Sequence, residues 1–134
     1  KGILRVKARV LRTTNKLEEN VVGERVVTKF VIEVQQMGVK WEVAKRYSEF
    51  AKFHDALVSM WADLPELPPK FLFSQHSTDI AERMLQLDAY LRDLLSTPAL
   101  MLDPLVCEFL DTIDRHGLRA QLASDLQVQP FSRS

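Results

Sequence analysis

Lys45-Arg46-Tyr47-Ser48-Glu49-Phe50 marks the place where one hydrophobic period gives way to another. Before it, apolar and polar residues alternate, as in half-buried strands; after it, apolar residues recur every three or four positions, as in a helix. Arg46 offers a planar fork of donors suited to a phosphate, and Tyr47 offers a flat ring with one hydroxyl. On this hexapeptide alone, however, a solvated strand end beside a core aromatic is the favoured interpretation.

Three strand-like segments are expected before this junction, over residues 3–12, 24–36 and 39–46, with a polar connection over 13–23. Met37-Gly38 predicts a tight hairpin turn, so the strands form an antiparallel meander. The inward positions of the second strand are Val26, Thr28, Phe30, Ile32 and Val34, and those of the third are Val39, Trp41 and Val43. The outward face of the first strand carries Arg5, Lys7 and Arg9.

Helical periodicity follows the junction. Ser48 is the expected cap of a first helix, whose apolar positions are Phe50, Phe53, Leu57, Met60 and Trp61. Residues 64–70 form a proline-rich extended loop. A second helix is expected from the cap Thr78-Asp79 to a point before Pro98, burying Ile80, Met84, Leu87, Leu91 and Leu94. A third is expected over 104–114, ending by Gly117, with a further short helix over about 118–127.

Strands followed by helices predict an α+β domain, in which a three-stranded antiparallel sheet packs on a helical subdomain of three to four helices. The length of 134 residues suits one domain over 1–134, with a core of about 3–115 and a C-terminal extension over 118–134. The first residue is not Met, so we expect the chain to be part of a longer protein.

Composition restricts the function. The formal net charge is zero, which argues against nucleic-acid or polybasic membrane binding, because both depend on summed positive charge. One cysteine excludes an internal disulfide and favours a reducing, cytosolic setting. His54, His76 and His116 lie far apart in the sequence, and none has a metal-ligand spacing to Cys107. We therefore expect no enzyme, no metal and no cofactor.

Anion binding is the better hypothesis. Arg46 precedes the strand-to-helix junction, Lys70 ends the rigid proline-rich loop, and Arg83 lies at the edge of the apolar stripe of the second helix. The run Phe71-Leu72-Phe73 follows Lys70, and apolar tips beside basic groups suit a membrane surface. Each feature also has an ordinary explanation as surface charge or loop packing.

Together these motifs resemble the phox-homology (PX) domain of sorting nexins and NADPH-oxidase subunits. The resemblance covers about residues 3–115. It is carried by Arg46-Tyr47-Ser48-Glu49-Phe50, by Leu67-Pro68-Pro69-Lys70, and by Arg83 with Leu87, Tyr90, Leu91 and Leu94. Three separated motifs in the family's order make the match specific.

The resemblance implies a pocket for a phosphoinositide head group, most often phosphatidylinositol 3-phosphate on the cytosolic face of endosomal membranes. Arg46 would hold the 3-phosphate, Tyr47 would lie under the inositol ring, and Lys70 would meet the 1-phosphate. Arg83 would bind the 4- and 5-hydroxyls. Leu72 and Phe73 would form the membrane-inserting tip.

Other interpretations stay open. Pro65-Glu66-Leu67-Pro68-Pro69-Lys70 fits the Pro-x-x-Pro-x-Lys pattern that Src-homology-3 domains bind, which would make the chain a protein-interaction module. The ligand could also be a multiply phosphorylated phosphoinositide. Finally, Arg5, Lys7 and Arg9 could form an additional lipid site, although a solvated sheet surface explains them equally simply.

Overall fold

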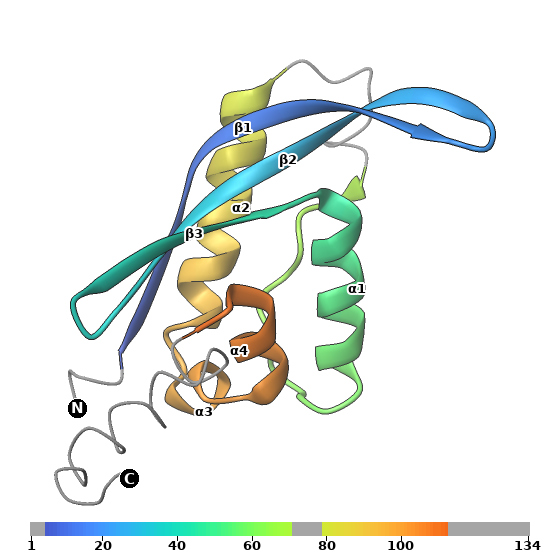
Figure 1. Cartoon of the computed structure of the whole chain (residues 1–134). Coiled ribbons are helices and arrows are strands. Elements are labelled where there is room, and N and C mark those ends of the chain that lie inside the picture. Colours follow the sequence, from blue (N-terminus) through green and yellow to red (C-terminus); the bar gives the residue numbers. More distant parts are fainter. Residues whose placement is uncertain (1–4, 71–78, 113–134) are drawn as a thin grey trace, which may run out of the picture.

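A three-stranded antiparallel sheet in the order β1-β2-β3 is followed by helices, which confirms the expected α+β class (Figure 1). The structure is a computed structural model, and it describes residues 5–70 and 79–112. The strands are β1 (Val6–Asn20), β2 (Gly23–Gln36) and β3 (Val39–Lys45). The helices are α1 (Tyr47–Val58), α2 (Ile80–Leu94), α3 (Pro98–Met101) and α4 (Pro104–Leu110).

The expected polar connection over 13–23 is wrong, because these residues are strand. β1 and β2 pair in one regular register from Arg12↔Val31 to Asn20↔Gly23, and the turn is Val21-Val22. β3 ends opposite Phe30, at Lys45, so the rest of the hairpin projects beyond the sheet as an arm (Figure 1). Threonines and β-branched residues suit paired strands, and Thr28 Oγ1 donates to Asn15 Oδ1 across the arm at 2.7 Å.

A bulge changes which side chains of the hairpin face inward. The register shifts between Val10 and Arg12, so Leu11 has no direct partner on β2. Val26, expected to face inward, lies on the arm beyond the end of β3 and is 65% exposed, whereas its neighbour Val27 is buried. Val39 is likewise exposed at the start of β3. The hairpin turn Met37-Gly38 is confirmed by positive φ angles of 54° and 79° at these two residues.

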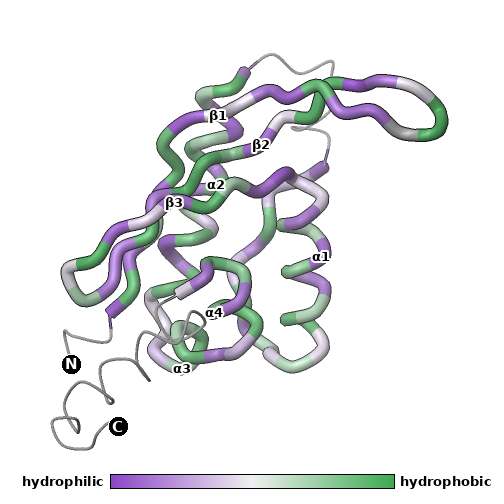
Figure 2. The backbone as a smooth tube through the Cα atoms, in the orientation of Figure 1, coloured by the Kyte–Doolittle hydropathy of each residue, from purple (hydrophilic) through white to green (hydrophobic). Residues whose placement is uncertain are grey.

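The core lies between the inner face of the sheet and the helices. Figure 2 shows how apolar segments of the strands and helices face one another there. Phe50 and Phe53 of α1 both meet Phe109 of α4, with ring centroids 5.1 and 4.1 Å apart. The buried apolar residues of this core include Phe30, Ile32, Val34, Leu57, Leu87, Leu91, Leu94 and Leu110. Each fully buried side chain of this size contributes roughly 1.5–3 kcal/mol of hydrophobic stabilisation.

Several helix boundaries differ from the expected ones. α1 is capped by Arg46 and not by Ser48, and it ends at Val58, so Met60 is exposed beyond it. Asp79 caps α2 as expected, yet Ile80 is 43% exposed, since it lies in the first turn beyond the packed part of the helix. α3 was not expected. α4 ends at Leu110 because Asp111 takes the left-handed conformation, with φ of 56°.

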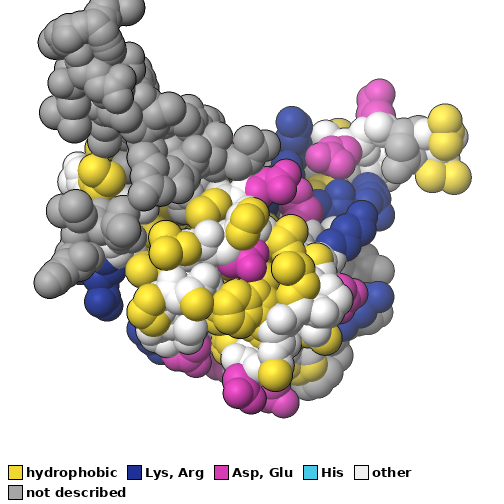
Figure 3. Space-filling view, turned by 90° about the horizontal axis from the view of Figure 1, so that it is seen from below, with side chains coloured by type: hydrophobic (Ala, Val, Ile, Leu, Met, Phe, Trp, Pro, Cys, Tyr) yellow, Lys and Arg dark blue, Asp and Glu magenta, His cyan; other side chains and the backbone are white. Residues whose placement is uncertain are grey.

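Positions 114–127, where the sequence predicts the end of the third helix and a further short helix, lie outside the described residues. The expected single domain over 1–134 stays a prediction for the same reason. In the part of the chain that the structure describes, no helix is long and apolar enough to cross a membrane. Seen from below, apolar side chains gather on the end of the fold where α1 finishes (Figure 3); the exposed ones include Val58, Met60 and Leu102.

One buried carboxylate connects the helical layer to the end of α1. Asp103 is 7% exposed and caps α4 by accepting a hydrogen bond from the Leu105 N–H at 2.8 Å. Its second oxygen accepts from the indole Nε1 of Trp61 at 2.9 Å. Because the carboxylate satisfies two donors at once, its loss leaves both without an acceptor.

We expect Asp103→Ala to lower the free energy of unfolding by about 1–3 kcal/mol, because the variant loses both the cap of α4 and the hydrogen bond from the half-buried indole of Trp61. Urea unfolding followed by tryptophan fluorescence measures the loss. Asp63→Ala, at an exposed position, is the matched control and should change stability little. Equal losses in the two variants would contradict this role for Asp103.

Candidate functional site

Arg46 is held firmly by its backbone. Its N–H donates to Glu49 Oε1 at 2.9 Å, and its carbonyl accepts from the Glu49 and Phe50 N–H groups at 2.9 and 3.3 Å. The residue is the N-cap of α1, with extended φ and ψ of −89° and 164°. The backbone bonds leave the guanidinium free to bind, and no acid among residues 5–70 and 79–112 forms an ion pair with it. The backbone of Arg46 is therefore fixed, while its guanidinium group is available to bind an anion.

Tyr47 connects the strand-to-helix junction to the proline-rich loop. Its hydroxyl donates to the carbonyl oxygen of Pro68 at 2.7 Å. This bond fixes the ring next to Arg46 and places the junction beside the segment that ends, two residues later, at Lys70. Burial, and to a smaller extent the negative charge of Asp55, raise the pKa of the Tyr47 hydroxyl above its ordinary value of 10.0. Tyr47 is thus a positioned neutral ring with its hydroxyl already engaged.

Lys70 is exposed and ends a loop that packs inward. Pro68 is buried, and Leu64 and Leu67 lie against the core. In the described part of the chain, no ion pair involves Lys70. The burial of Pro68 argues against the Src-homology-3 interpretation, because such a domain would have to contact this proline, which the fold packs inward.

Arg83 is half-buried in the first turns of α2. α1 and α2 run in the same direction, and both begin at the upper end of the fold (Figure 1). Side-chain contacts between the two helices fix their relative position along the helix axes. The Phe50 and Tyr90 rings lie 6.5 Å apart, and His54 Nδ1 lies 2.8 Å from the Tyr90 hydroxyl. Arg83 is two turns before Tyr90, and Arg46 one turn before Phe50. Both arginines therefore lie at the same end of the helical layer.

The structure thus brings Arg46 and Tyr47 together with the loop that ends in Lys70. They lie at the end of the fold where the first turns of α2 carry Arg83. Two helix N-termini at one end add partial positive charge there. Leu72 and Phe73, the expected membrane tip, lie outside the described residues, so their role stays a prediction. Among the residues that are described, no group of three His, Cys, Asp or Glu side chains can hold a metal ion.

Two contributors to this site were not expected from the sequence. Glu49 fixes the Arg46 backbone, and its position three residues after the cap is the usual signal for that role. The Pro68 carbonyl fixes Tyr47, and nothing local in the sequence pairs those two residues.

Comparison with known proteins identifies the family. The family model described as "PX domain" matches residues 33–112, more than half of the chain. The chain belongs to the PX domain family. PX domains are typically phosphoinositide-binding modules that direct proteins to membranes.

Curated relatives are larger proteins. Kinesin-like protein KIF16B of Homo sapiens is 39% identical over 70 residues, which cover 50% of this chain and 5% of that protein. HCLS1-binding protein 3 of Mus musculus is 41% identical over 76 residues, which cover 55% of this chain and 19% of that protein. PX domain-containing protein kinase-like protein of Rattus norvegicus is 32% identical over 112 residues, covering 80% and 19%. The chain therefore spans about a fifth or less of these relatives.

Solved structures share the fold. A designed CISK-PX domain aligns with a TM-score of 0.67 at 31% identity, covering 79% of this chain and 99% of that one. The mouse SNX19 PX domain with bound sulphate ion aligns with a TM-score of 0.61 at 23% identity, and the alignment covers 79% of this chain and 96% of that one. The resemblance inferred from the three motifs is confirmed.

Removal of the Tyr47 hydroxyl tests its link to the loop. We expect Tyr47→Phe to lower the free energy of unfolding by about 0.5–1.5 kcal/mol, because the buried Pro68 carbonyl loses its donor. The raised pKa adds a pH dependence: the folded state holds the phenolic proton more tightly, so this stabilisation is complete below about pH 10 and is lost as the pH rises through the folded pKa.

The wild-type chain should therefore lose more stability than Tyr47→Phe between about pH 9 and about pH 11. Urea unfolding at both values measures the difference, and Tyr90, present in both chains, serves as the internal control. Identical pH dependence in the two proteins would show that the Tyr47 hydroxyl has no link to stability.

Proposed function

We propose that this chain recruits its parent protein to membranes by binding phosphatidylinositol 3-phosphate, as a peripheral module on the cytosolic face of endosomes. The observation that carries the proposal is the Tyr47–Pro68 hydrogen bond of 2.7 Å. It holds a ring and a guanidinium on one side and the Lys70 loop on the other, which is the arrangement that a phosphorylated ring compound requires. The role is binding and includes no catalytic step.

Each basic residue has a separate task in this proposal. Arg46 holds the 3-phosphate through its fork of donors, and the ring of Tyr47 lies beneath the inositol. Lys70, exposed at the end of the loop, meets the 1-phosphate nearest the bilayer. Arg83 donates to the 4- and 5-hydroxyls and disfavours phosphates at those positions. The half-burial of Arg46 supports its task, because a partly desolvated guanidinium group binds phosphate more strongly than an exposed one.

The arm supplies a second membrane contact in this proposal. It leaves the sheet at Phe30, opposite the last residue of β3 before Arg46, and carries Val21 and Val22 at its tip with exposed fractions of 105% and 91%. Leu17 and Val26 on the same arm are also exposed. Apolar side chains presented this openly are suited to the boundary between head groups and acyl chains. With Leu72 and Phe73, the tip would give two apolar anchors beside one head-group pocket.

The first test removes the phosphate-binding fork. We expect Arg46→Gln to weaken binding to vesicles containing phosphatidylinositol 3-phosphate by at least about tenfold, since a hydrogen bond to a charged group contributes about 1.5–3 kcal/mol. Co-sedimentation across vesicles that carry single phosphoinositides measures both affinity and selectivity. Arg92→Gln, the same charge change at the other end of α2, is the control. Undiminished binding by Arg46→Gln, or equal binding to every anionic vesicle, would overturn the proposal.

The second test separates the membrane anchors from the head-group pocket. Val21→Glu with Val22→Glu, and Leu72→Glu with Phe73→Glu, should each weaken vesicle binding, while affinity for soluble inositol 1,3-bisphosphate stays within about twofold. Val58→Glu with Met60→Glu is the matched control, because those apolar side chains are exposed at the opposite end of the fold. Loss of soluble ligand binding in either anchor variant would assign its side chains to the fold and not to the membrane.

A further inference from the structure

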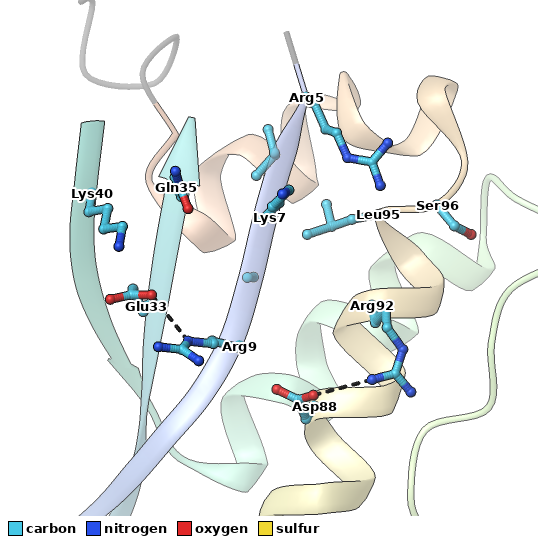
Figure 4. Close-up of a pocket in the computed structure, with 12 residues that line it drawn as sticks. Arg5, Lys7, Arg9, Glu33, Gln35, Lys40, Asp88, Arg92, Leu95 and Ser96 are labelled. Carbon is cyan, nitrogen blue, oxygen red and sulfur yellow. Dashed lines mark hydrogen bonds and ion pairs between the residues drawn. The ribbon is translucent and has the colours of Figure 1, made fainter. Parts of the chain in front are cut away.

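A cavity of about 500 Å³ lies away from the candidate lipid site, where the first half of β1 meets the second half of α2 (Figure 4). This volume is within the usual range for ligand pockets, about 300–1,000 Å³. The wall comes from three strands and one helix. The residues that line it are Arg5, Val6, Lys7, Ala8, Arg9, Glu33, Gln35, Lys40, Asp88, Arg92, Leu95 and Ser96.

The cavity is strongly basic although the chain as a whole is neutral. Five of its lining residues are Lys or Arg and two are acids. Both acids are engaged: Glu33 pairs with Arg9 at 3.2 Å, and Asp88 pairs with Arg92 at 3.4 Å. Arg5, Lys7 and Lys40 form no ion pair with any of the described residues. Three cations are therefore available to an incoming anion.

The spacing of these cations favours an extended ligand with several charges. Arg5 directly precedes β1, and Lys7 lies two residues further along the extended chain, about 6.8 Å away, which is also the repeat of alternate side chains in an extended peptide. Lys7 and Lys40 flank Gln35, since Lys7 pairs with Gln35 on one side and Lys40 on the other. An acidic segment with carboxylates at alternate positions matches the spacing of Arg5 and Lys7, and Lys40 extends the contact across the sheet.

The free edge of β1 adds a neutral donor. The Val10 N–H donates to Asp88 Oδ1 at 2.8 Å, and the Val6 N–H points to the Met101 sulfur at 3.2 Å, so both leave the strand on the side away from β2. Strand alternation places the Ala8 N–H between them, on the same side, in the wall of the cavity. Backbone donors of this kind bind an extended peptide independently of its side chains.

The position of the basic cavity favours a protein ligand over a second lipid. Arg83 and Arg92 lie nine residues apart on α2, about 13 Å along the helix axis. Lys40 and Arg46 lie six residues apart along and just beyond β3, about 20 Å in extended chain. Both elements thus run from the basic cavity to the lipid site. A domain held to a bilayer at one end presents the cavity at the other, away from head groups of the same leaflet.

We propose that this cavity binds an extended acidic segment of a protein partner while the opposite end of the domain is on the membrane. Arg5, Lys7 and Lys40 meet its carboxylates, the Ala8 N–H meets a backbone carbonyl, and Leu95 contributes an apolar floor. The assignment of a protein and not a lipid rests on the proposed lipid site, whereas the anion binding itself does not.

Fluorescence anisotropy with a labelled Ser-Glu-Asp-Glu-Asp-Glu-Ser peptide tests the proposal on the full 134-residue chain. Lys7→Glu with Lys40→Glu should weaken peptide binding by at least about tenfold, because like charges face each other across the contact. Lys16→Glu with Lys52→Glu changes the net charge equally at exposed positions outside the cavity and should leave binding within about twofold. Circular dichroism checks that both variants fold.

Two further measurements separate a failure of this proposal from a failure of the lipid-binding proposal. Arg46→Gln should leave peptide binding unchanged, so a failure of the lipid proposal is visible independently of this one. Vesicles of phosphatidylserine without phosphoinositide test the alternative ligand. The proposal is overturned if the peptide does not bind to the wild-type chain. It is also overturned if the peptide binds equally well to the cavity variant, Lys7→Glu with Lys40→Glu, and to the control variant. If Lys7→Glu with Lys40→Glu abolishes vesicle binding while the peptide does not bind, the cavity is a second lipid site.

Discussion

The hydrogen bond from the Tyr47 hydroxyl to the Pro68 carbonyl is the contact on which the candidate lipid site depends. It joins the strand-to-helix junction to a loop 21 residues further along the chain. Prolines in that loop leave few backbone donors, so the loop is held by packing and by bonds to its carbonyls. A rigid loop fixed at Pro68 positions Lys70 relative to Arg46 before any ligand arrives, and preorganisation of this kind reduces the cost of binding.

α2 connects the two ends of the molecule. Its first turns carry Arg83, Leu87 and Leu91 pack into the core, and its second half carries Asp88 and Arg92 to the edge of β1. Asp88 performs two tasks there, because it accepts the Val10 N–H and pairs with Arg92. The helix therefore protects an edge strand from unwanted pairing at one position while leaving the cavity beside it open.

The sequence predicts the fold class well because the hydrophobic period changes only once, at residues 45–50. It predicts Arg46, Tyr47 and Arg83 as neighbours only through the family resemblance, since no local rule pairs Tyr47 with Pro68 or aligns α1 with α2. The hairpin arm is missed because a bulge at Leu11 interrupts the alternation, and polar strand residues without a covering layer look like a loop. The basic cavity is missed because Lys40 and Arg92 join Arg5 and Lys7 from distant elements.

A net charge of zero argues against binding by bulk positive charge, yet it says nothing about how the charges are distributed. The arm carries three acids, Glu18, Glu19 and Glu24, and three bases, Lys16, Arg25 and Lys29, whereas five of the 18 basic residues of the chain line the cavity. At physiological salt, charges further apart than about 8 Å are largely screened from one another. Since the arm projects beyond the sheet, its glutamates do not cancel the field within the cavity. Placed cations can therefore select an anion at each end of a domain that is neutral as a whole.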